Sequence, residues 1–462
     1  MTGFRFRLES LHELGVCNLI AINEKQRKNG TTCGPLKSRT SLKSGKNTIS
    51  HDAALRLLMA VESGEKHSDL VREEMVAILS HWLQSPTDPP ILVQQSHGKK
   101  WTNILHNWSL VAQDKPALGL APENGKISPL KIDFSDVPLP PVAKPKFTFI
   151  DLFAGIGGFR IALQNLGGKC VFSSEWNHQS KETYYKNYGE VPFGDLTRLS
   201  HLKLFHEGLD VLAGGFPCQP FSRAGVSARE ALGQNHGFKC ENQGQLFFNI
   251  LEIAKKHRPR MLILENVGNL IRHDSGYTFA VIRERIEKFL GYSFNFSVYN
   301  TNTLVPQNRV RCIIVAFRDG TPHGWKMPKL AGQPLPLKSI LEDVPCDSPY
   351  TLTDKMWLGH IRRSDRNVAR GTGFTAYVKD LDKPSTTLVA RYYKDGKECL
   401  IPQPNHPREL PRMLTPRECA RLQGFPEEFE PHKSKVNAYK QFGNAVPVPL
   451  VEFVAEHALS HI

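Results

Sequence analysis

The stretch Asp210-Val-Leu-Ala-Gly-Gly-Phe-Pro-Cys-Gln-Pro-Phe-Ser222 is a short apolar run that stops at a proline. A run of this length that ends in a turn is typical of a buried strand, so we expect Cys218 at a strand tip. Most cysteines in intracellular chains are buried and unreactive, and this stretch alone supports a structural Cys218 and a nucleophilic Cys218 equally. The surrounding sequence decides between them.

Similar apolar runs occur on both sides of this stretch, with helical patterns at 160–166, 246–256 and 278–290 between them. The alternation predicts an α/β fold with a doubly wound, Rossmann-like sheet. Ligands of such sheets bind at the carboxyl ends of the strands, so residues that follow the runs should converge there. The runs and their following residues are Phe147–Phe153 before Gly155, Lys169–Ser174 before Glu175, Val211–Phe216 before Cys218 and Met261–Leu264 before Glu265, with Asp195 after a helix and turn.

The stretch Asp151-Leu-Phe-Ala-Gly-Ile-Gly-Gly158 predicts a turn from strand to helix that lets a ligand approach the backbone closely. Glu175 lies 20 residues after Gly155, a spacing that suits a carboxylate binding ribose hydroxyls. The turn departs from GxGxxG, which favours a nucleoside without phosphates over a dinucleotide. Asp195 is a candidate acceptor for the adenine amino group. A purely structural glycine turn is the alternative.

The chain has 462 residues, of which 40% are hydrophobic, enough for two or three domains. A formal net charge of +14 favours a polyanionic partner. Nine cysteines without CxxC pairs argue against a disulfide framework and a structural zinc site, so no metal is predicted. No apolar run reaches the roughly 18 residues of a membrane span, and the amino terminus lacks a signal-peptide core, so we expect a cytoplasmic protein without a membrane partner.

Six segments in order resemble the motif series of the DNA (cytosine-5) methyltransferases of bacterial restriction-modification systems. They are Phe149-Ile-Asp-Leu-Phe-Ala-Gly-Ile-Gly-Gly-Phe-Arg160, Gly214-Gly-Phe-Pro-Cys-Gln-Pro-Phe-Ser222, Glu265-Asn-Val267, Gln307-Asn-Arg-Val-Arg311, Arg417-Glu-Cys-Ala-Arg-Leu-Gln-Gly-Phe-Pro426 and Gln441-Phe-Gly-Asn-Ala-Val446. The resemblance starts near residue 147 and does not cover residues 1–145. It implies S-adenosylmethionine as methyl donor, the methyltransferase fold of that family, double-stranded DNA as substrate, and base flipping.

The resemblance and the composition together predict four parts of the chain. A proline-rich stretch, Ser135–Pro145, reads as a stiff linker. Helical spacing in Ala53–Val61 and Leu70–Leu83 predicts a small helical module before it. The parts are an amino-terminal basic and helical extension with its linker (1–145), a catalytic, cofactor-binding domain (146–319), a target-recognition domain (320–411) and a carboxyl-terminal segment (412–462), whose last helix returns to the catalytic domain.

The predicted mechanism starts from the poor nucleophilicity of cytosine carbon 5. A thiolate that adds at carbon 6 activates carbon 5, and Cys218 is the candidate nucleophile. Glu265, if it carries or shares a proton, assists at N3 and accepts from the amino group. Arg309 and Arg311 alternate on an expected strand, so both are predicted to face the flipped nucleotide, although an isolated Arg-x-Arg pair is more often a solvated strand face.

Two further sets of residues complete the predicted site. The cofactor set is Phe153, Gly155, Ile156, Gly157, Gly158, Glu175, Trp176, Asp195, Pro217 and, by resemblance, Asn444. The nucleic-acid set is Gln219, Ser222, Arg223, Thr387 and Arg391. Residues 219–243, polar and rich in glycine, are a predicted lid over the flipped base.

Two alternatives remain open: a tRNA cytosine-5 methyltransferase on the same scaffold, and a DNA-binding regulator that uses residues 1–145. If the chain is a DNA (cytosine-5) methyltransferase, we expect it to be a monomer with a cognate restriction endonuclease as a functional rather than physical partner. A CCWGG-like target is one hypothesis.

Overall fold

The structure is a computed structural model that describes residues 48–65, 67–85, 95–111, 131–199, 208–216, 245–372, 376 and 378–462. The chain divides into two compact units. The first comprises Met1–Pro140 with Tyr188–Val191, and the second comprises Pro141–Asn187 with Pro192–Ile462. The division falls within the stretch predicted as a linker, and it assigns four later residues to the first unit.

The first unit is a small helical module with one short pair of strands. Among its described residues, strands β1 and β2 pair in parallel, and four helices lie between them in the sequence. The side chains of Trp82 and Trp101 form the centre of its core, with ring centroids 5.1 Å apart, and Trp101 Nε1 donates to the buried carboxylate of Glu62 at 2.8 Å. The elements are β1 (Thr48–Ser50), α3 (His51–Glu62), α4 (Asp69–Glu73), α5 (Met75–Gln84), α6 (Gln95–Val111) and β2 (Lys131–Asp133).

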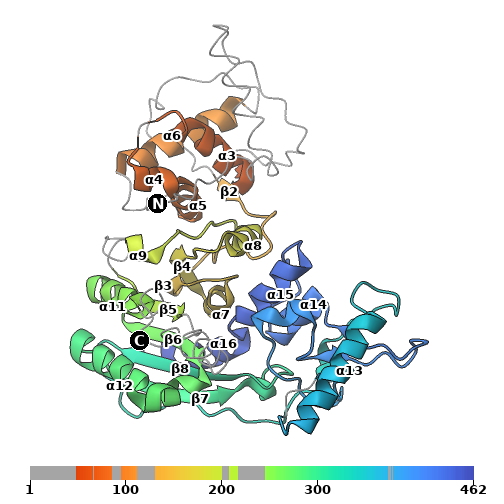
Figure 1. Ribbon diagram of the computed structural model, residues 1–462. Helices are drawn as coiled ribbons and strands as arrows, with labels where there is room; N and C mark the ends of the chain where they lie inside the picture. The colour runs from red at the N-terminus through yellow and green to blue at the C-terminus, as the bar shows by residue number, and fades with distance from the viewer. Residues whose placement is uncertain are drawn as a thin grey trace. The chain divides into compact units, whose positions relative to one another are not determined.

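The second unit is built on a six-stranded sheet with the order β4-β3-β5-β6-β8-β7 (Figure 1). The first four of these strands are parallel, whereas β8 and β7 are antiparallel to their neighbours. Long apolar runs make the central strands, because a strand covered on both faces has few polar positions. The strands are β3 (Phe147–Leu152), β4 (Gly168–Ser174), β5 (Val211–Gly215), β6 (Met261–Val267), β7 (Asn295–Asn300) and β8 (Val310–Phe317).

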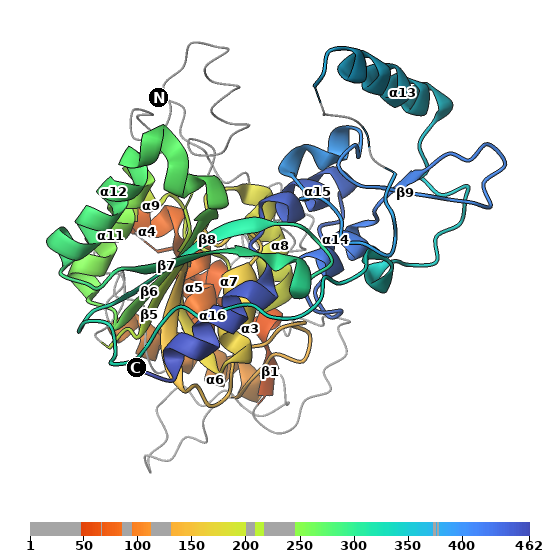
Figure 2. The ribbon, with the colours of Figure 1, turned by 90° about the horizontal axis from the view of Figure 1, so that it is seen from below.

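Helices cover both faces of this sheet, which confirms the predicted α/β fold. Figure 2 shows α11 and α12 on one face and α7 and α16 on the other. None of the helices in the described part of the chain is long and apolar enough to cross a membrane. The helices around the sheet are α7 (Gly158–Asn165), α8 (His178–Tyr188), α9 (Leu196–Leu199), α11 (Gln245–His257), η2 (Gly268–Gly276), α12 (Tyr277–Glu284), η3 (Arg285–Leu290), η4 (Thr301–Thr303) and α16 (Val448–Leu459).

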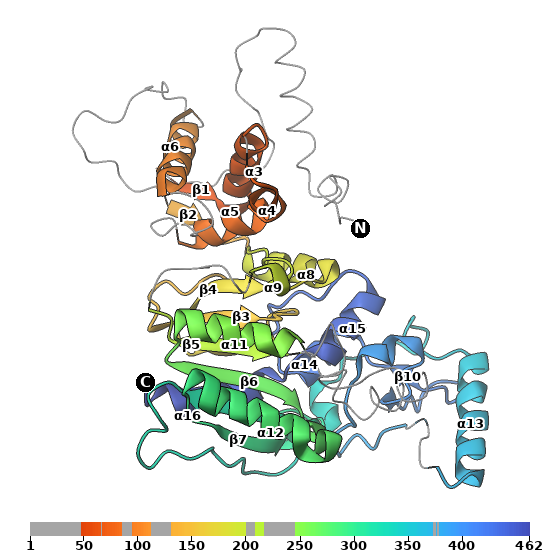
Figure 3. The ribbon, with the colours of Figure 1, turned by 60° about the vertical axis from the view of Figure 1, so that its left-hand side comes forward.

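Residues 337–444, after β8, form mostly short elements, and the 16-residue helix α13 lies at the outer edge of the unit (Figure 3). Helix α14 begins with a capping box: Thr415 Oγ1 accepts from the Glu418 backbone nitrogen, and the Glu418 carboxylate accepts from the Thr415 backbone nitrogen. The elements are η5 (Leu337–Ile340), α13 (Asp354–Ala369), η6 (Ala390–Lys394), β9 (Leu400–Ile401), its antiparallel partner β10 (Arg412–Met413), α14 (Pro416–Leu422) and α15 (Lys435–Asn444).

Candidate active site

The carboxyl ends of the parallel strands lie side by side at one edge of the sheet. Leu152 at the end of β3 is in register with Ser174 of β4 and with Gly214 of β5, and Gly215 is in register with Glu265 of β6. The glycine turn, Glu175 and Glu265 therefore start from adjacent positions, as the sequence predicts.

The turn after β3 departs from ordinary backbone geometry at three positions. Phe153, Gly155 and Gly157 have φ values of 57°, 56° and 85°, in the left-handed region. A non-glycine residue there costs of order 1 kcal/mol, so the surrounding structure must hold Phe153 in place. Among the described residues, a Cβ atom added to Gly155 would meet nothing nearer than Phe153 O at 4.0 Å. The backbone at Gly155 therefore borders open space that a ligand can use.

Glu175 links this turn to the end of β4. Its Oε2 accepts from the Gly155 backbone nitrogen at 2.9 Å, and its Oε1 accepts from the Asn177 backbone nitrogen at 2.7 Å. Burial raises the pKa of Glu175, and the backbone donors act in the opposite direction. The next side chain, Trp176, is 84% exposed. An oriented carboxylate beside an open turn and a bare indole fits a nucleoside, with the ribose on Glu175 and the base on Trp176.

Asp195 follows helix α8 and a turn, as predicted. Phe193, two residues before it, forms an isolated parallel bridge with Ser174, the last residue of β4. Asp195 Oδ1 accepts from the backbone nitrogen and the hydroxyl of Thr197, at 2.9 and 2.8 Å, and Asp195 is exposed. Asp195 therefore lies close to the end of β4, the strand that precedes Glu175, and its exposed side chain caps α9.

Asn444, the carboxyl-terminal member of the cofactor set, is the exposed last residue of α15. Val446, two residues later, packs against the glycine turn: a Cβ on Gly158 would lie 2.7 Å from Val446 Cγ1 and 3.1 Å from Val446 O. Only a glycine at position 158 permits this approach, and it places the segment that carries Asn444 beside the turn.

Glu265 and Arg311 form an ion pair at the end of β6. Arg311 Nε lies 2.6 Å from Glu265 Oε1, and the side chains are 11% and 13% exposed. The adjacent Asn266 is buried; its Nδ2 donates to Phe216 O at 3.2 Å and its Oδ1 accepts from the Val267 backbone nitrogen at 2.8 Å. Asn266 thus fastens the residue that precedes Pro217 to the strand that carries Glu265.

Arg309 does not share the orientation of Arg311, which corrects the expectation that both face one side of a strand. Strand β8 begins at Val310, so the alternation of side chains does not extend to Arg309. Its guanidinium is 1% exposed and donates to the main-chain oxygens of Leu388, Gly443 and Ala445.

The two described members of the nucleic-acid set lie in and next to η6. Arg391 is exposed. Thr387 is partly buried and donates through Oγ1 to Asn308 O at 2.6 Å, so its hydroxyl supports the backbone. The predicted Pro217, Cys218, Gln219, Ser222 and Arg223, and the lid at 219–243, lie outside the described residues.

Gln307 is a site residue to which the sequence assigned no role. It is fully buried; Nε2 donates to Leu422 O at 3.1 Å, and Oε1 accepts from the Leu388 backbone nitrogen at 2.8 Å. Its signal is its position in Gln307-Asn-Arg-Val-Arg311, but its partners lie 81 and 115 residues later in the chain.

Comparisons with known proteins identify the family to which the chain belongs. Residues 147–460 match the family model of the C-5 cytosine-specific DNA methylases. The Type II methyltransferase M.DsaV of Dactylococcopsis salina is 43% identical over 323 residues, which are 69% of this chain and 88% of that protein. The Type II methyltransferase M.SsoII of Shigella sonnei is 41% identical over 340 residues, 71% of this chain and 84% of the relative.

Among solved structures, the methyltransferase EhMeth of Entamoeba histolytica matches with a TM-score of 0.51 and 19% identity, over 68% of this chain and 98% of that one. At this identity the similarity shows the fold alone.

Proposed function

Since the chain belongs to the C-5 cytosine-specific DNA methylase family and methylates carbon 5 of cytosine in DNA with S-adenosylmethionine as donor, we propose that Cys218 and Glu265 carry the reaction. The observation that supports this most is the joining of β5 to β6. Gly215 is in register with Glu265, and Asn266 binds Phe216 O, two residues before Cys218. The chain that leads into the nucleophile is thus fastened beside the acid.

In the proposed mechanism the Cys218 thiolate adds to carbon 6 of a flipped cytosine, and the electron density moves onto carbon 5. Glu265 hydrogen-bonds N3 and the amino group, where charge develops. Arg311 holds the Glu265 carboxyl from one side, because the Nε–Oε1 contact fixes one oxygen and leaves the other free to meet the base. Carbon 5 gains the methyl group, its proton leaves to water, and the thiolate is expelled.

S-adenosylmethionine supplies the methyl group when it is bound. The residues at the strand ends fit its nucleoside: Glu175 would accept from the ribose hydroxyls, Trp176 would stack on the adenine, and Asp195 would accept from the adenine amino group. Gly155 keeps the turn open beside them. The remaining predicted members belong to the same proposal; they are Phe153, Ile156, Gly157, Gly158, Pro217 and Asn444.

The biological role that we propose is protection of host DNA in a restriction-modification system, with a cognate endonuclease as functional partner. The support is that M.DsaV and M.SsoII are both named Type II methyltransferases. We propose that the enzyme acts as a monomer on one short duplex site.

The first experiment is bisulfite sequencing of DNA from a methylation-free host that expresses the full chain, with Cys218→Ser alongside. We expect methylated cytosines at one short motif and none with the variant. Soluble protein with unmethylated DNA but methylated tRNA would overturn the DNA assignment. Methylation that persists with Cys218→Ser would instead overturn only the nucleophile.

A further inference from the structure

The segment Pro306–Arg309 joins parts of the second unit that are distant in sequence. Gln307 bridges Leu388 and Leu422, and Asn308 accepts from the Thr387 hydroxyl. Asn308 in turn donates from its backbone nitrogen to Ser385 O at 2.8 Å. Residues 385–388, which lie within the predicted target-recognition domain (320–411), are thereby hydrogen-bonded to the two residues that precede Arg309.

Arg309 extends this junction to the carboxyl-terminal segment. Nη1 donates to Leu388 O at 2.8 Å, and Nη2 donates to Gly443 O at 3.1 Å and Ala445 O at 2.7 Å. Asn444, the predicted cofactor residue, lies between the two carbonyls that share Nη2. A cation that donates to main-chain oxygens orders that backbone strongly, because each charge-assisted hydrogen bond outweighs a neutral one.

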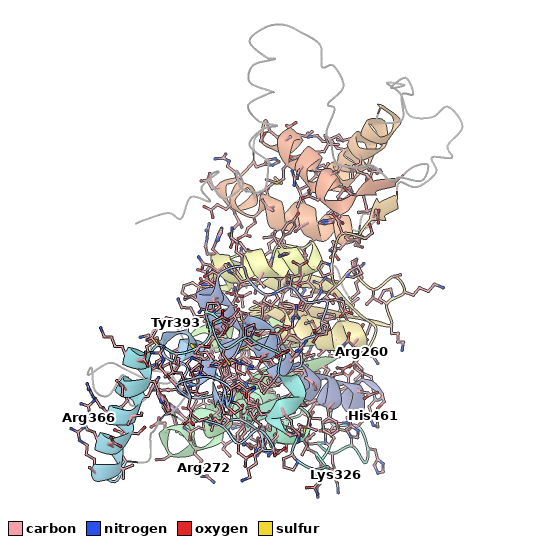
Figure 4. The ribbon with its side chains drawn as sticks, turned by 90° about the vertical axis from the view of Figure 1, so that its right-hand side faces the viewer. Arg260, Arg272, Lys326, Arg366, Tyr393 and His461 are labelled. Atoms are coloured by element: carbon pink, nitrogen blue, oxygen red, sulfur yellow. The ribbon has the colours of Figure 1, made fainter. Side chains whose placement is uncertain are left out.

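The two segments that Arg309 holds also touch each other directly. A Cβ on Gly443 would lie 2.3 Å from Ala390 N and 2.3 Å from Val389 C, so the backbones of α15 and η6 are in contact there. Nearby, Lys440 Nζ lies 5.0 Å from the ring centroid of Tyr393, which Figure 4 labels. The same set of contacts extends to the glycine turn, because Val446 packs against Gly158.

We propose that Arg309 is a positioning residue that couples DNA recognition to cofactor binding. It joins residues 385–391 to residues 443–446, and through Val446 to the glycine turn, without touching the flipped nucleotide. Only Arg311 of the Arg-x-Arg pair faces the reacting base. The inference rests on the proposed function for the identity of the two ligands, but the junction itself is present without them.

Hydrogen exchange of the full chain without DNA or cofactor tests the junction directly. Arg309→Lys keeps the charge but cannot span three carbonyls, so we expect faster exchange at 387–391 and 444–448 and no change in β5 and β6. Arg417→Lys is the matched control, because Arg417 also donates to two main-chain oxygens, those of Pro426 and Phe429. It should affect only its own surroundings. Unchanged exchange at 387–391 and 444–448 in Arg309→Lys would overturn the proposal, whether or not the enzyme methylates DNA.

A second readout is S-adenosylmethionine affinity, measured by calorimetry in the absence of DNA. We expect the dissociation constant of Arg309→Lys to rise about tenfold, the loss of roughly one charge-assisted hydrogen bond. If Arg309 instead contacts the nucleotide, cofactor affinity will match wild type while 2-aminopurine fluorescence at the target base shows no flipping.

Gly443→Ala approaches the same junction from its other side and removes no charge. The added methyl group must push α15 and η6 apart, so the variant should reproduce the exchange pattern and the weaker cofactor binding of Arg309→Lys. If Arg309→Lys does not fold, the cofactor affinity of Gly443→Ala decides whether the coupling exists. A cofactor dissociation constant within about twofold of wild type would then overturn the coupling, since a twofold change is less than 0.5 kcal/mol.

Discussion

Nε of Arg311 lies 2.6 Å from Oε1 of Glu265, although the two residues belong to strands that run in opposite directions. Glu265 pairs with Ile313, and Arg311 is two residues before Ile313, so both side chains leave the same face of the sheet as a diagonal pair. The pair orients the Glu265 carboxyl before any base arrives.

Replacing this carboxyl should affect the chemical step and leave cofactor binding intact. We expect Glu265→Gln to lower kcat by about 10² to 10⁴, the usual contribution of a positioned acid. Single-turnover methylation and calorimetry with S-adenosylmethionine measure the two properties separately. Glu284→Gln, which breaks an exposed ion pair with Lys288, is the control and should leave kcat unchanged. A Glu265→Gln enzyme with wild-type kcat would remove Glu265 from the reaction.

The two hydrogen bonds of the Asn266 side chain should contribute to both the stability and the activity of the enzyme. Asn266→Ala leaves Phe216 O and the Val267 backbone nitrogen without their buried partner, which costs about 1–3 kcal/mol. Urea denaturation measures this loss, and kcat should fall because the chain before Cys218 is no longer fastened. Asn295→Ala removes a comparable amide at the opposite edge of the sheet and should leave kcat near wild type. Equal losses of activity in the two variants would contradict a local role.

Cofactor binding should weaken in acid because of Glu175. Burial raises its pKa above the ordinary 4.5, so on acidification the folded protein takes up this proton at a higher pH than an exposed glutamate would. The carboxylate is the form that accepts from two ribose hydroxyls, and affinity should therefore fall as the pH drops through the raised pKa. Calorimetry between pH 8 and pH 5 tests this. Glu175→Gln should bind about tenfold more weakly at pH 8 and lose the dependence. An equally steep profile in the variant would assign the titration to another group.

Trp176 should contribute to cofactor affinity and hardly to stability. Its side chain is 84% exposed, so Trp176→Ala should change the free energy of unfolding by no more than about 0.5 kcal/mol. The loss of a stacking surface should raise the S-adenosylmethionine dissociation constant about tenfold. Tyr277→Ala removes another exposed aromatic side chain, on α12, and should bind the cofactor as wild type does. Unaltered affinity in Trp176→Ala would exclude the indole from the cofactor site.

The capping box of α14 offers a purely structural prediction. Thr415→Ala removes the acceptor of the Glu418 backbone nitrogen and should lower the free energy of unfolding by about 1 kcal/mol. Thr415→Ser keeps the hydroxyl and should stay close to wild type in the same urea titration. A loss shared by both variants would indicate that the methyl group, rather than the cap, stabilises the helix.

The strands and their polar ends were predictable because each is a short local pattern. Apolar runs before Glu175 and Glu265 mark buried strands, and parallel strands in a doubly wound sheet end at one edge. The capping box formed by Thr415 and Glu418 is equally predictable, since such a box needs only four consecutive residues.

Arg309 was not predictable from such patterns. A two-residue alternation applies only inside a strand, and β8 begins one residue after Arg309. Its three acceptors lie 79, 134 and 136 residues further along the chain. The helical structure predicted at Leu70–Leu83 is confirmed, but it is divided into two helices because Glu74 leaves the α-region and separates α4 from α5.

The reversed direction of β8 also determines where this enzyme can be modified. Arg311 lies near the start of β8, at the edge of the sheet where the ligands are proposed to bind. Strand β8 therefore ends at the opposite edge, where Phe317 is in register with Met261 at the start of β6. The chain then turns through the exposed Asp319 to Gly320, whose φ is 89° and whose added Cβ would have no atom of the described part of the chain within 4 Å. An affinity tag or fluorophore inserted there would be a full strand length away from the flipped base, which makes this turn a suitable handle for single-molecule work.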